Sequence, residues 1–156
     1  MNTHMKRHLV LALASLFALA PLPALHADEA PPLTAEQKAD LASLQGSWEG
    51  TETGHEADGK CTLTISGDAW SFEGWQKGEW YKATVTLAPA VTPKELVAVV
   101  KDCPAAQAIG LTAHAIYKLE NGTLTLVGHG PGDATTPATF SGDANSRIFV
   151  FKKVQQ

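Results

Sequence analysis

The sequence lacks the motifs that usually mark an enzyme. It has no Gly-x-Ser-x-Gly nucleophile elbow, no His-Glu-x-x-His metal motif and no catalytic-cysteine pattern. The glycine-rich segment 128–133 is not followed by Lys-Ser or Lys-Thr, so it does not qualify as a phosphate-binding loop. No pattern joins a nucleophile, a base and a group to orient them, and we expect a protein without catalytic activity or cofactor.

Positive charge is scarce as well. The chain has 12 basic residues against 16 acidic ones, and its lysines and arginines never form more than a pair in sequence. Nucleic acid and anionic membrane surfaces attract clustered basic side chains, so both are poor candidate partners.

Long hydrophobic runs are also missing. The longest apolar stretch covers residues 9–20, and a membrane-spanning helix needs about 20 residues. Lys6 and Arg7 precede this stretch and the small-residue end Leu25-His26-Ala27 follows it, which is the order found in secretory signal peptides. We therefore expect a signal peptide over residues 1–27, export to the periplasm or medium, and no membrane span. Cleavage would leave ten basic residues against 16 acidic ones, a net charge of −6.

Cysteine is limited to Cys61 and Cys103. In an exported chain two cysteines most simply form one disulfide, which we predict here. A loop of this length would stabilise the fold by about 4 kcal/mol in the chain-entropy model. A reactive thiol and a metal thiolate are the alternatives, but no CxxC pattern or nearby histidine supports either.

The clearest positive signal is the segment 115–127. Two runs rich in β-branched, aromatic and leucine residues flank Asn121-Gly122, the dipeptide that best fits a type I′ turn. A two-residue loop there would place Tyr117 opposite Leu126 and Glu120 opposite Thr123. We predict a hairpin with one apolar face, whose register is well specified because a one-residue slip would expose that face.

The remainder of the chain reads as one domain built from similar strands. Residues 28–34 form a Pro- and Ala-rich lead, and the capping box that starts at Thr34 predicts a helix over 35–44. One helical turn is possible near 136–140. Closely spaced strands with short links predict an all-β, eight-stranded antiparallel up-and-down barrel over residues 35–156. The expected strands are 46–54, 61–66, 69–75, 79–88, 95–102, 111–120, 123–129 and 147–154.

Gly46 and Trp48 form a Gly-x-Trp signature, and segments 116–119, 123–126 and 149–153 follow it in order. In these segments the chain resembles a family of small exported bacterial lipocalin-like domains with no assigned activity. The resemblance covers residues 44–153 and begins with the Gly-x-Trp signature at Gly46 and Trp48. It implies an eight-stranded calycin-type barrel in which Trp48 closes one end and a basic residue of the last strand, here Lys152 or Lys153, packs over it. The other matching segments are 91–96, 109–110, 116–119, 123–126, 136–140 and 149–153.

Three histidines remain after the predicted cleavage. In the hairpin register His114 would lie opposite His129, and Asp133 could complete a metal site. The pattern places no third histidine beside them, and the glycines around His129 are expected to end the strand first. We therefore predict no metal site.

Two binding functions fit this architecture, and a purely structural role in the cell envelope is a third alternative. The first is binding of a small apolar molecule inside the barrel, because small inward-facing residues leave volume unfilled. The second is binding or inhibition of an envelope protein through the loops 53–60, 75–80 and 128–136, with Trp75 and Trp80 as contact residues. The predicted ligand-lining residues are Phe72, Tyr81, Ala83, Val85, Ala113, Ala115 and Tyr117.

Overall fold

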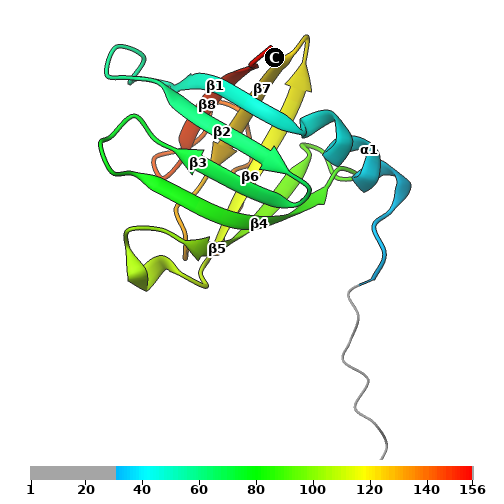
Figure 1. The fold of residues 1–156 in the computed structure, drawn as a ribbon. Coiled ribbons are helices and arrows are strands. Elements are labelled where there is room, and N and C mark those ends of the chain that lie inside the picture. Colours follow the sequence, from blue (N-terminus) through cyan, green and yellow to red (C-terminus); the bar gives the residue numbers. More distant parts are fainter. Residues whose placement is uncertain (1–30, 156) are drawn as a thin grey trace, which may run out of the picture. The chain divides into compact units, whose positions relative to one another are not determined.

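A computed structural model describes residues 31–155, which form one helix, eight strands and a short 3-10 helix (Figure 1). The predicted signal peptide lies outside these residues. No helix among residues 31–155 is both long and apolar enough to cross a membrane. The elements are α1 (Ala35–Leu44), β1 (Gly46–Glu52), β2 (Cys61–Ser66), β3 (Ala69–Glu73), β4 (Trp80–Ala88), β5 (Glu95–Asp102), the 3-10 helix (Ala106–Ala108), β6 (Thr112–Glu120), β7 (Thr123–Gly128) and β8 (Arg147–Lys153).

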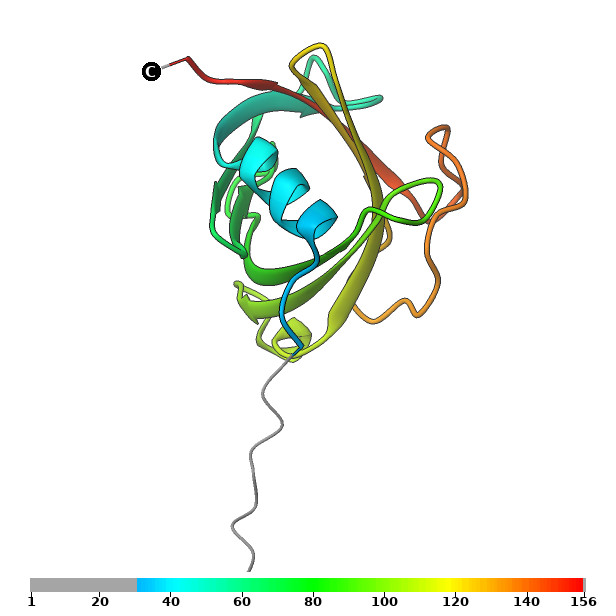
Figure 2. The ribbon, with the colours of Figure 1, turned by 90° about the vertical axis from the view of Figure 1, so that its right-hand side faces the viewer.

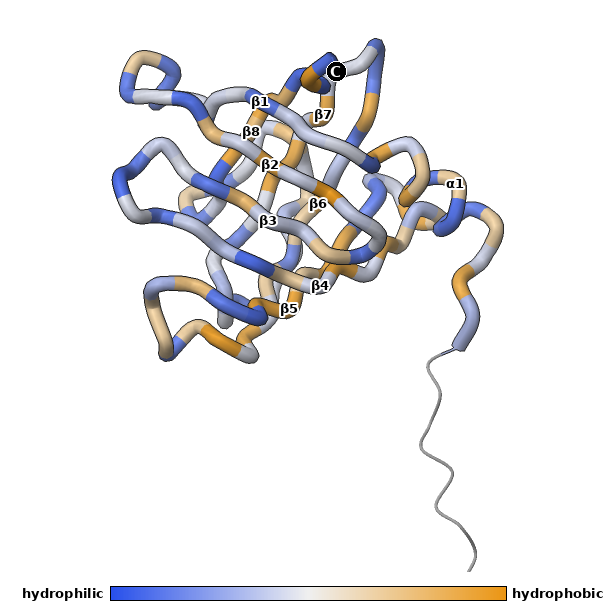
Figure 3. The backbone as a smooth tube through the Cα atoms, in the orientation of Figure 1, coloured by the Kyte–Doolittle hydropathy of each residue, from blue (hydrophilic) through white to orange (hydrophobic). Residues whose placement is uncertain are grey.

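The strands form a closed antiparallel barrel in sequence order, with β8 returning to pair with β1. This confirms the predicted up-and-down barrel, and the strand bounds agree to within two residues. Side chains alternate between the two faces: in β2 every second residue is buried and the others are exposed. Figure 3 shows hydrophobic and hydrophilic residues interspersed along the strands.

The β6–β7 hairpin has the predicted register. Tyr117 pairs with Leu126, Leu119 with Leu124 and Glu120 with Thr123. Asn121 and Gly122 both adopt positive φ, 50° and 71°. These values match the type I′ turn, whose twist suits a two-residue hairpin.

The barrel closes where Gly50 of β1 lies against β8. Gly50 pairs with Phe151, and a Cβ atom added at Gly50 would lie 1.9 Å from the Val150 carbonyl oxygen. Only a residue without a side chain allows the two strands to approach this closely.

Helix α1 lies across one end of the barrel (Figure 2). It begins with the predicted capping box, in which Thr34 and Gln37 exchange side-chain to backbone hydrogen bonds. Leu44 at its last position is fully buried. The Gln37 side chain also donates to the Leu87 carbonyl at 2.7 Å, so the helix is attached to the barrel at both of its ends.

Trp48 has the structural role that the resemblance implied. Its side chain is buried, and its Nε1 donates to the Leu44 carbonyl at 2.9 Å. The Lys153 ammonium lies 5.3 Å from the centre of the indole ring, which makes Lys153 the basic residue that packs over this end. Gly46 lies beneath the same lysine, because a Cβ there would be 3.3 Å from Lys153 Cε.

The predicted disulfide is not formed. Cys61 and Cys103 are both free and buried thiols. Cys61 begins β2 and Cys103 follows β5, with β3 and β4 between them in the sheet. Three strand spacings amount to roughly 14 Å along the sheet, whereas bridged cysteines need Cα atoms within about 7 Å. Spacing in sequence could not show that the two cysteines lie on well-separated strands.

The long β7–β8 connection differs from expectation too. Residues 136–140 form no helical turn, and the only 3-10 helix in the described chain is in the β5–β6 connection. The β7–β8 connection instead packs over Ile148 on the outer face of β8, since a Cβ at Gly142 would lie 3.2 Å from Ile148 Cδ1, whereas Val150 on the same face is exposed. This contact accounts for the apolar residue at Ile148 on the outer face of the last strand.

Candidate ligand site

The barrel interior contains a cavity of about 220 Å³ on the side away from α1. Arg147 lines the cavity, and its side chain is 35% exposed, so the cavity meets solvent at this residue. We call this end of the barrel, where β8 begins and β7 ends, the mouth. Most of the wall is apolar, and it comes mainly from β3, β4, β5 and β6.

The volume exists because four inward positions carry alanine. Ala83 lies on β4, Ala98 on β5, and Ala113 and Ala115 on β6. Ala98 pairs directly with Ala113, so two methyl groups face the interior where larger side chains would fill it. The aromatic part of the wall is Trp70, Phe72, Tyr81 and Phe149.

The structure places six of the seven predicted lining residues on this wall: Phe72, Tyr81, Ala83, Val85, Ala113 and Ala115. Tyr117 is the exception. Its buried hydroxyl donates to Asp40 Oδ2 of α1 at 2.7 Å, so it belongs to the closed end of the barrel. Burial and the bond to Asp40 raise the pKa of Tyr117 well above its ordinary range.

A charged cluster stands at the mouth. The Arg147 guanidinium donates to Glu52 from Nε at 2.8 Å and from a terminal nitrogen at 2.7 Å. It also donates to both carboxylate oxygens of Glu79. Trp75 Nε1 donates to Glu52 at 2.7 Å. The end of β1, the β3–β4 loop and the start of β8 are thereby joined at Arg147, the member of the cluster that lines the cavity.

These contacts shift the pKa values of Glu52 and Arg147. The hydrogen bonds from Arg147 lower the pKa of Glu52, and this outweighs burial, which acts in the opposite direction. The carboxylates of Glu52 and Glu79 in turn raise the pKa of Arg147, despite its partial burial. Two carboxylates and one guanidinium leave this cluster with a net negative charge.

The predicted contact residues Trp75 and Trp80 are each half buried. Trp75 stacks on His55, with ring centres 4.5 Å apart, and is hydrogen-bonded to Glu52. The Lys82 ammonium lies 5.6 Å from the centre of the Trp80 ring. Both rings are therefore packed against neighbouring side chains of the same molecule.

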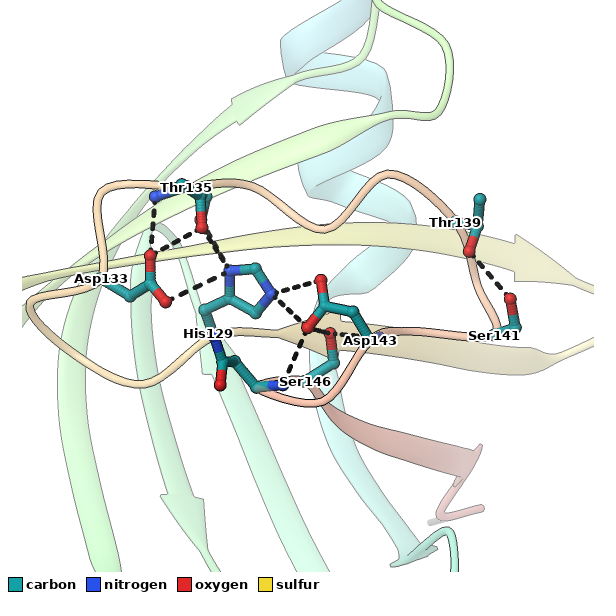
Figure 4. A network of polar contacts seen from close by, with 8 residues as sticks. His129, Asp133, Thr135, Thr139, Ser141, Asp143 and Ser146 are labelled. Carbon is teal, nitrogen blue, oxygen red and sulfur yellow. Dashed lines mark hydrogen bonds and ion pairs between the residues drawn. The ribbon is translucent and has the colours of Figure 1, made fainter.

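His129 fixes the long β7–β8 connection beside the mouth (Figure 4). Its side chain is 3% exposed. Nδ1 lies 2.9 Å from the Thr135 carbonyl oxygen, and Nε2 lies 3.1 and 3.0 Å from the two Asp143 oxygens. An imidazolium, which donates from both nitrogens, satisfies these acceptors.

The pKa values in this group follow from the same contacts. Burial acts to lower the pKa of His129, but its bonds to Thr135 and Asp143 and the charges of Asp143 and Asp133 outweigh burial and raise it. Hydrogen bonds from Thr135 lower the pKa of Asp133, and the Asn145 amide lowers that of Asp143.

His114 and His129 are neighbours, as the hairpin register implied. Strand β7 ends at Gly128, as we expected from the glycines around His129. One backbone hydrogen bond lies beyond it, in which the His129 amide donates to the His114 carbonyl at 3.0 Å. Residues 31–155 contain no group of three or more side chains placed to hold a metal ion.

Sequence reasoning missed part of the cavity wall. Leu96, Ala98 and Val100 of β5 line it, but residues 96–100 are apolar on both faces, so alternation does not show which side is inward. The mouth cluster was missed because Glu52 and Glu79 are 95 and 68 residues away from Arg147 in the sequence. No local pattern signals a contact of that range.

Together, the closed eight-stranded barrel, the helix across one end and the apolar cavity at the other define a lipocalin-like topology. Comparisons with protein-family models, curated proteins and solved structures find no match to this chain. The likeness to lipocalins is therefore a likeness of architecture.

Proposed function

We propose that this protein is an exported, non-enzymatic module that binds a small apolar molecule inside its barrel. The observation that carries the proposal is the cavity of about 220 Å³, with its apolar wall and its contact with solvent at Arg147. Concave apolar sites with a few polar groups at one end are the usual form of small-molecule sites in proteins.

Two further observations support ligand binding over action through the loops. Trp75 and Trp80, the aromatic residues of the candidate contact loop, are half buried. Their rings already contact side chains of the same molecule, namely His55, Glu52 and Lys82. The β7–β8 connection is likewise held by His129. Loops that bind a partner usually present free aromatic surface.

A binding experiment with toluene tests the proposal. Toluene titration should shift amide signals of cavity residues in a nitrogen–proton NMR correlation spectrum. Ala115→Leu, which fills the interior, should abolish these shifts, since the Ala115 side chain is on the cavity wall. Ala69→Leu is the matched control, because Ala69 is exposed at the start of β3. The proposal is wrong if toluene produces no shifts or if Ala115→Leu binds as well as the control.

Native mass spectrometry of the protein isolated from its own source tests the same idea without a chosen probe. A bound small molecule supports ligand binding. A tightly bound protein that survives in Ala115→Leu supports the alternative function, binding of an envelope protein through the loops.

A further inference from the structure

We propose that ligand binding in the barrel is coupled to the protonation of His129, so that the protein holds its ligand in acidic medium and releases it as the pH rises. The proposal rests on the proposed function and names a regulation of the same site. It depends on two observations: the His129 ring fixes the β7–β8 connection, and the chain at each end of that connection lines the cavity.

The cavity wall includes both ends of the β7–β8 connection. At the first end the lining residues are His129, Gly130 and Pro131. At the second end the lining residue is Arg147, with which β8 begins. The wall on this side therefore keeps its full shape only while the connection keeps its position.

The His129 ring joins the two halves of the connection to each other (Figure 4). Nδ1 faces the carbonyl oxygen of Thr135 in the first half, and Nε2 faces the carboxylate of Asp143 in the second half. That carboxylate also accepts from Ser146 Oγ at 3.0 Å, and Ser146 directly precedes Arg147. A change at the ring is therefore passed to the wall directly at the first end and through two hydrogen bonds at the second.

Loss of the proton weakens this attachment. An imidazolium donates from both ring nitrogens, whereas a neutral imidazole donates from only one. Either Thr135 or Asp143 then faces a ring nitrogen without a hydrogen, and the ring loses its charge attraction to Asp133 and Asp143. The His129 side chain is only 3% exposed, so little water can reach the ring to replace the missing hydrogen bond.

The charged groups around His129 come from three elements. Asp133 and Asp143 belong to the connection, and hydrogen bonds lower their pKa values below 3.8, so both stay ionised in neutral and weakly acidic medium. Arg147 of β8 stays protonated because its carboxylate partners raise its pKa. His114 of β6, whose carbonyl accepts from the His129 amide, is the other histidine in this region and provides the control position.

Toluene is a suitable probe because it has no group that ionises, so any dependence of its affinity on pH belongs to the protein. NMR titration between about pH 5.5 and 9 gives its dissociation constant on both sides of the histidine range. The pKa of His129 is raised above 6.5, so we expect a constant value below pH 6.5 and weaker binding at higher pH. The apparent dissociation constant rises as the fraction of molecules with a complete wall falls, and we expect a rise of about fivefold or more.

Three variants assign the effect to a residue. His129→Gln cannot titrate, so its toluene affinity should not depend on pH. Asp143→Asn removes a carboxylate that favours the imidazolium, so the loss of affinity should begin at lower pH than in the wild type. His114→Gln is the matched control on the same part of the wall, and it should keep the wild-type ratio of affinities at pH 6 and pH 9 whatever its absolute affinity.

A second measurement uses the wild-type protein and does not depend on the folding of any variant. Coupling between two sites is reciprocal, so saturation with toluene should raise the pKa of His129, followed by the NMR signals of its ring protons. The increase should equal the logarithm of the ratio of toluene affinities at low and high pH. An unchanged pKa would overturn the coupling.

The outcomes distinguish this proposal from the proposed function. Equal toluene affinities at pH 6 and pH 9 would overturn the coupling while the cavity remained a ligand site. A pH dependence that persists in His129→Gln or disappears in His114→Gln would also overturn it, because the proton would belong to another group. Absence of toluene binding at every pH would overturn the proposed function and this proposal with it.

Discussion

Arg147, at the start of β8, holds Glu52, at the end of β1, through two parallel hydrogen bonds of 2.8 and 2.7 Å. The Glu52 side chain is 9% exposed. A buried carboxylate depends on such a partner, because burial alone disfavours its charged form.

Arg147→Met should therefore destabilise the fold, since it leaves Glu52 buried without its cation. We expect a loss of about 3 kcal/mol at pH 7, at the lower end of the range for a broken buried pair because Arg147 itself is partly exposed. Urea unfolding measures it. Lys60→Met is the control, because the Lys60–Glu49 pair is exposed and should contribute little. Equal effects of the two substitutions would contradict this account.

The Glu52–Arg147 pair also predicts a loss of stability at acid pH. The folded-state pKa of Glu52 is below its ordinary value of 4.5, so its stabilisation is present above pH 4.5 and disappears as the pH falls through the lowered value. The difference in unfolding free energy between the wild type and Arg147→Met should shrink over that interval. A difference that stays constant down to pH 3 would show that Glu52 ionisation is not its source.

Gly50→Ala should open the seam between β1 and β8. The new Cβ would lie 1.9 Å from the Val150 carbonyl oxygen, a backbone atom that cannot move without breaking strand pairing. We expect a loss of about 3 kcal/mol or more, by thermal or urea unfolding. Gly130→Ala should change stability by less than about 0.5 kcal/mol, because a Cβ there has no atom within 4 Å. A Gly50→Ala protein as stable as Gly130→Ala would disprove the close approach.

The contacts of His129 predict that stability depends on pH with the sign opposite to that expected for Glu52. Its pKa is raised above 6.5, so its stabilisation of the β7–β8 connection is fully present below pH 6.5 and is lost as the pH rises through the raised value. Amide exchange in residues 133–146 should accelerate over that range beyond the intrinsic increase. His129→Gln should remove this dependence, and His55→Gln, at a partly buried position outside the connection, should retain it. A His129 pKa at or below 6.5 by NMR titration would contradict the prediction.

Tyr117→Phe separates the closed end of the barrel from the cavity. It removes the hydrogen bond to Asp40, which should cost about 1 to 2 kcal/mol of stability. Binding of toluene should not change, because Tyr117 is not on the cavity wall. A double-mutant cycle with Asp40→Asn should show coupling between the two sites. A selective loss of probe affinity in Tyr117→Phe would return this residue to the ligand site.

The two cysteines should behave as protected thiols. Burial raises the pKa of the Cys61 thiol, and the Cys103 Sγ–H donates to the Ala105 carbonyl at 3.1 Å. We expect slow alkylation of the native protein, and two additions per chain in denaturant without reductant, by intact mass. A mass two hydrogens lower with no additions would demonstrate the disulfide that the structure does not contain.

Local sequence patterns were sufficient to predict the helix and the strands. The capping box at Thr34, the Asn121-Gly122 turn and the alternation in β2 each depend on residues a few positions apart, and short-range backbone and side-chain preferences decide them. Where alternation is lost, as in β5, the inward face became clear only once its neighbours β4 and β6 were in register.

The sequence by itself determined an eight-stranded ring of alternating strands with a capped helix before it, because period, turn and cap are encoded within short segments. Three features required the folded barrel: the end that the helix closes, the positions of Tyr117 and the two cysteines, and the sharing of Arg147 by Glu52 and Glu79. These are contacts between residues up to 95 positions apart. They follow from the way the strands close into a barrel, which brings distant charges together at the mouth and leaves the alanine-lined volume behind them.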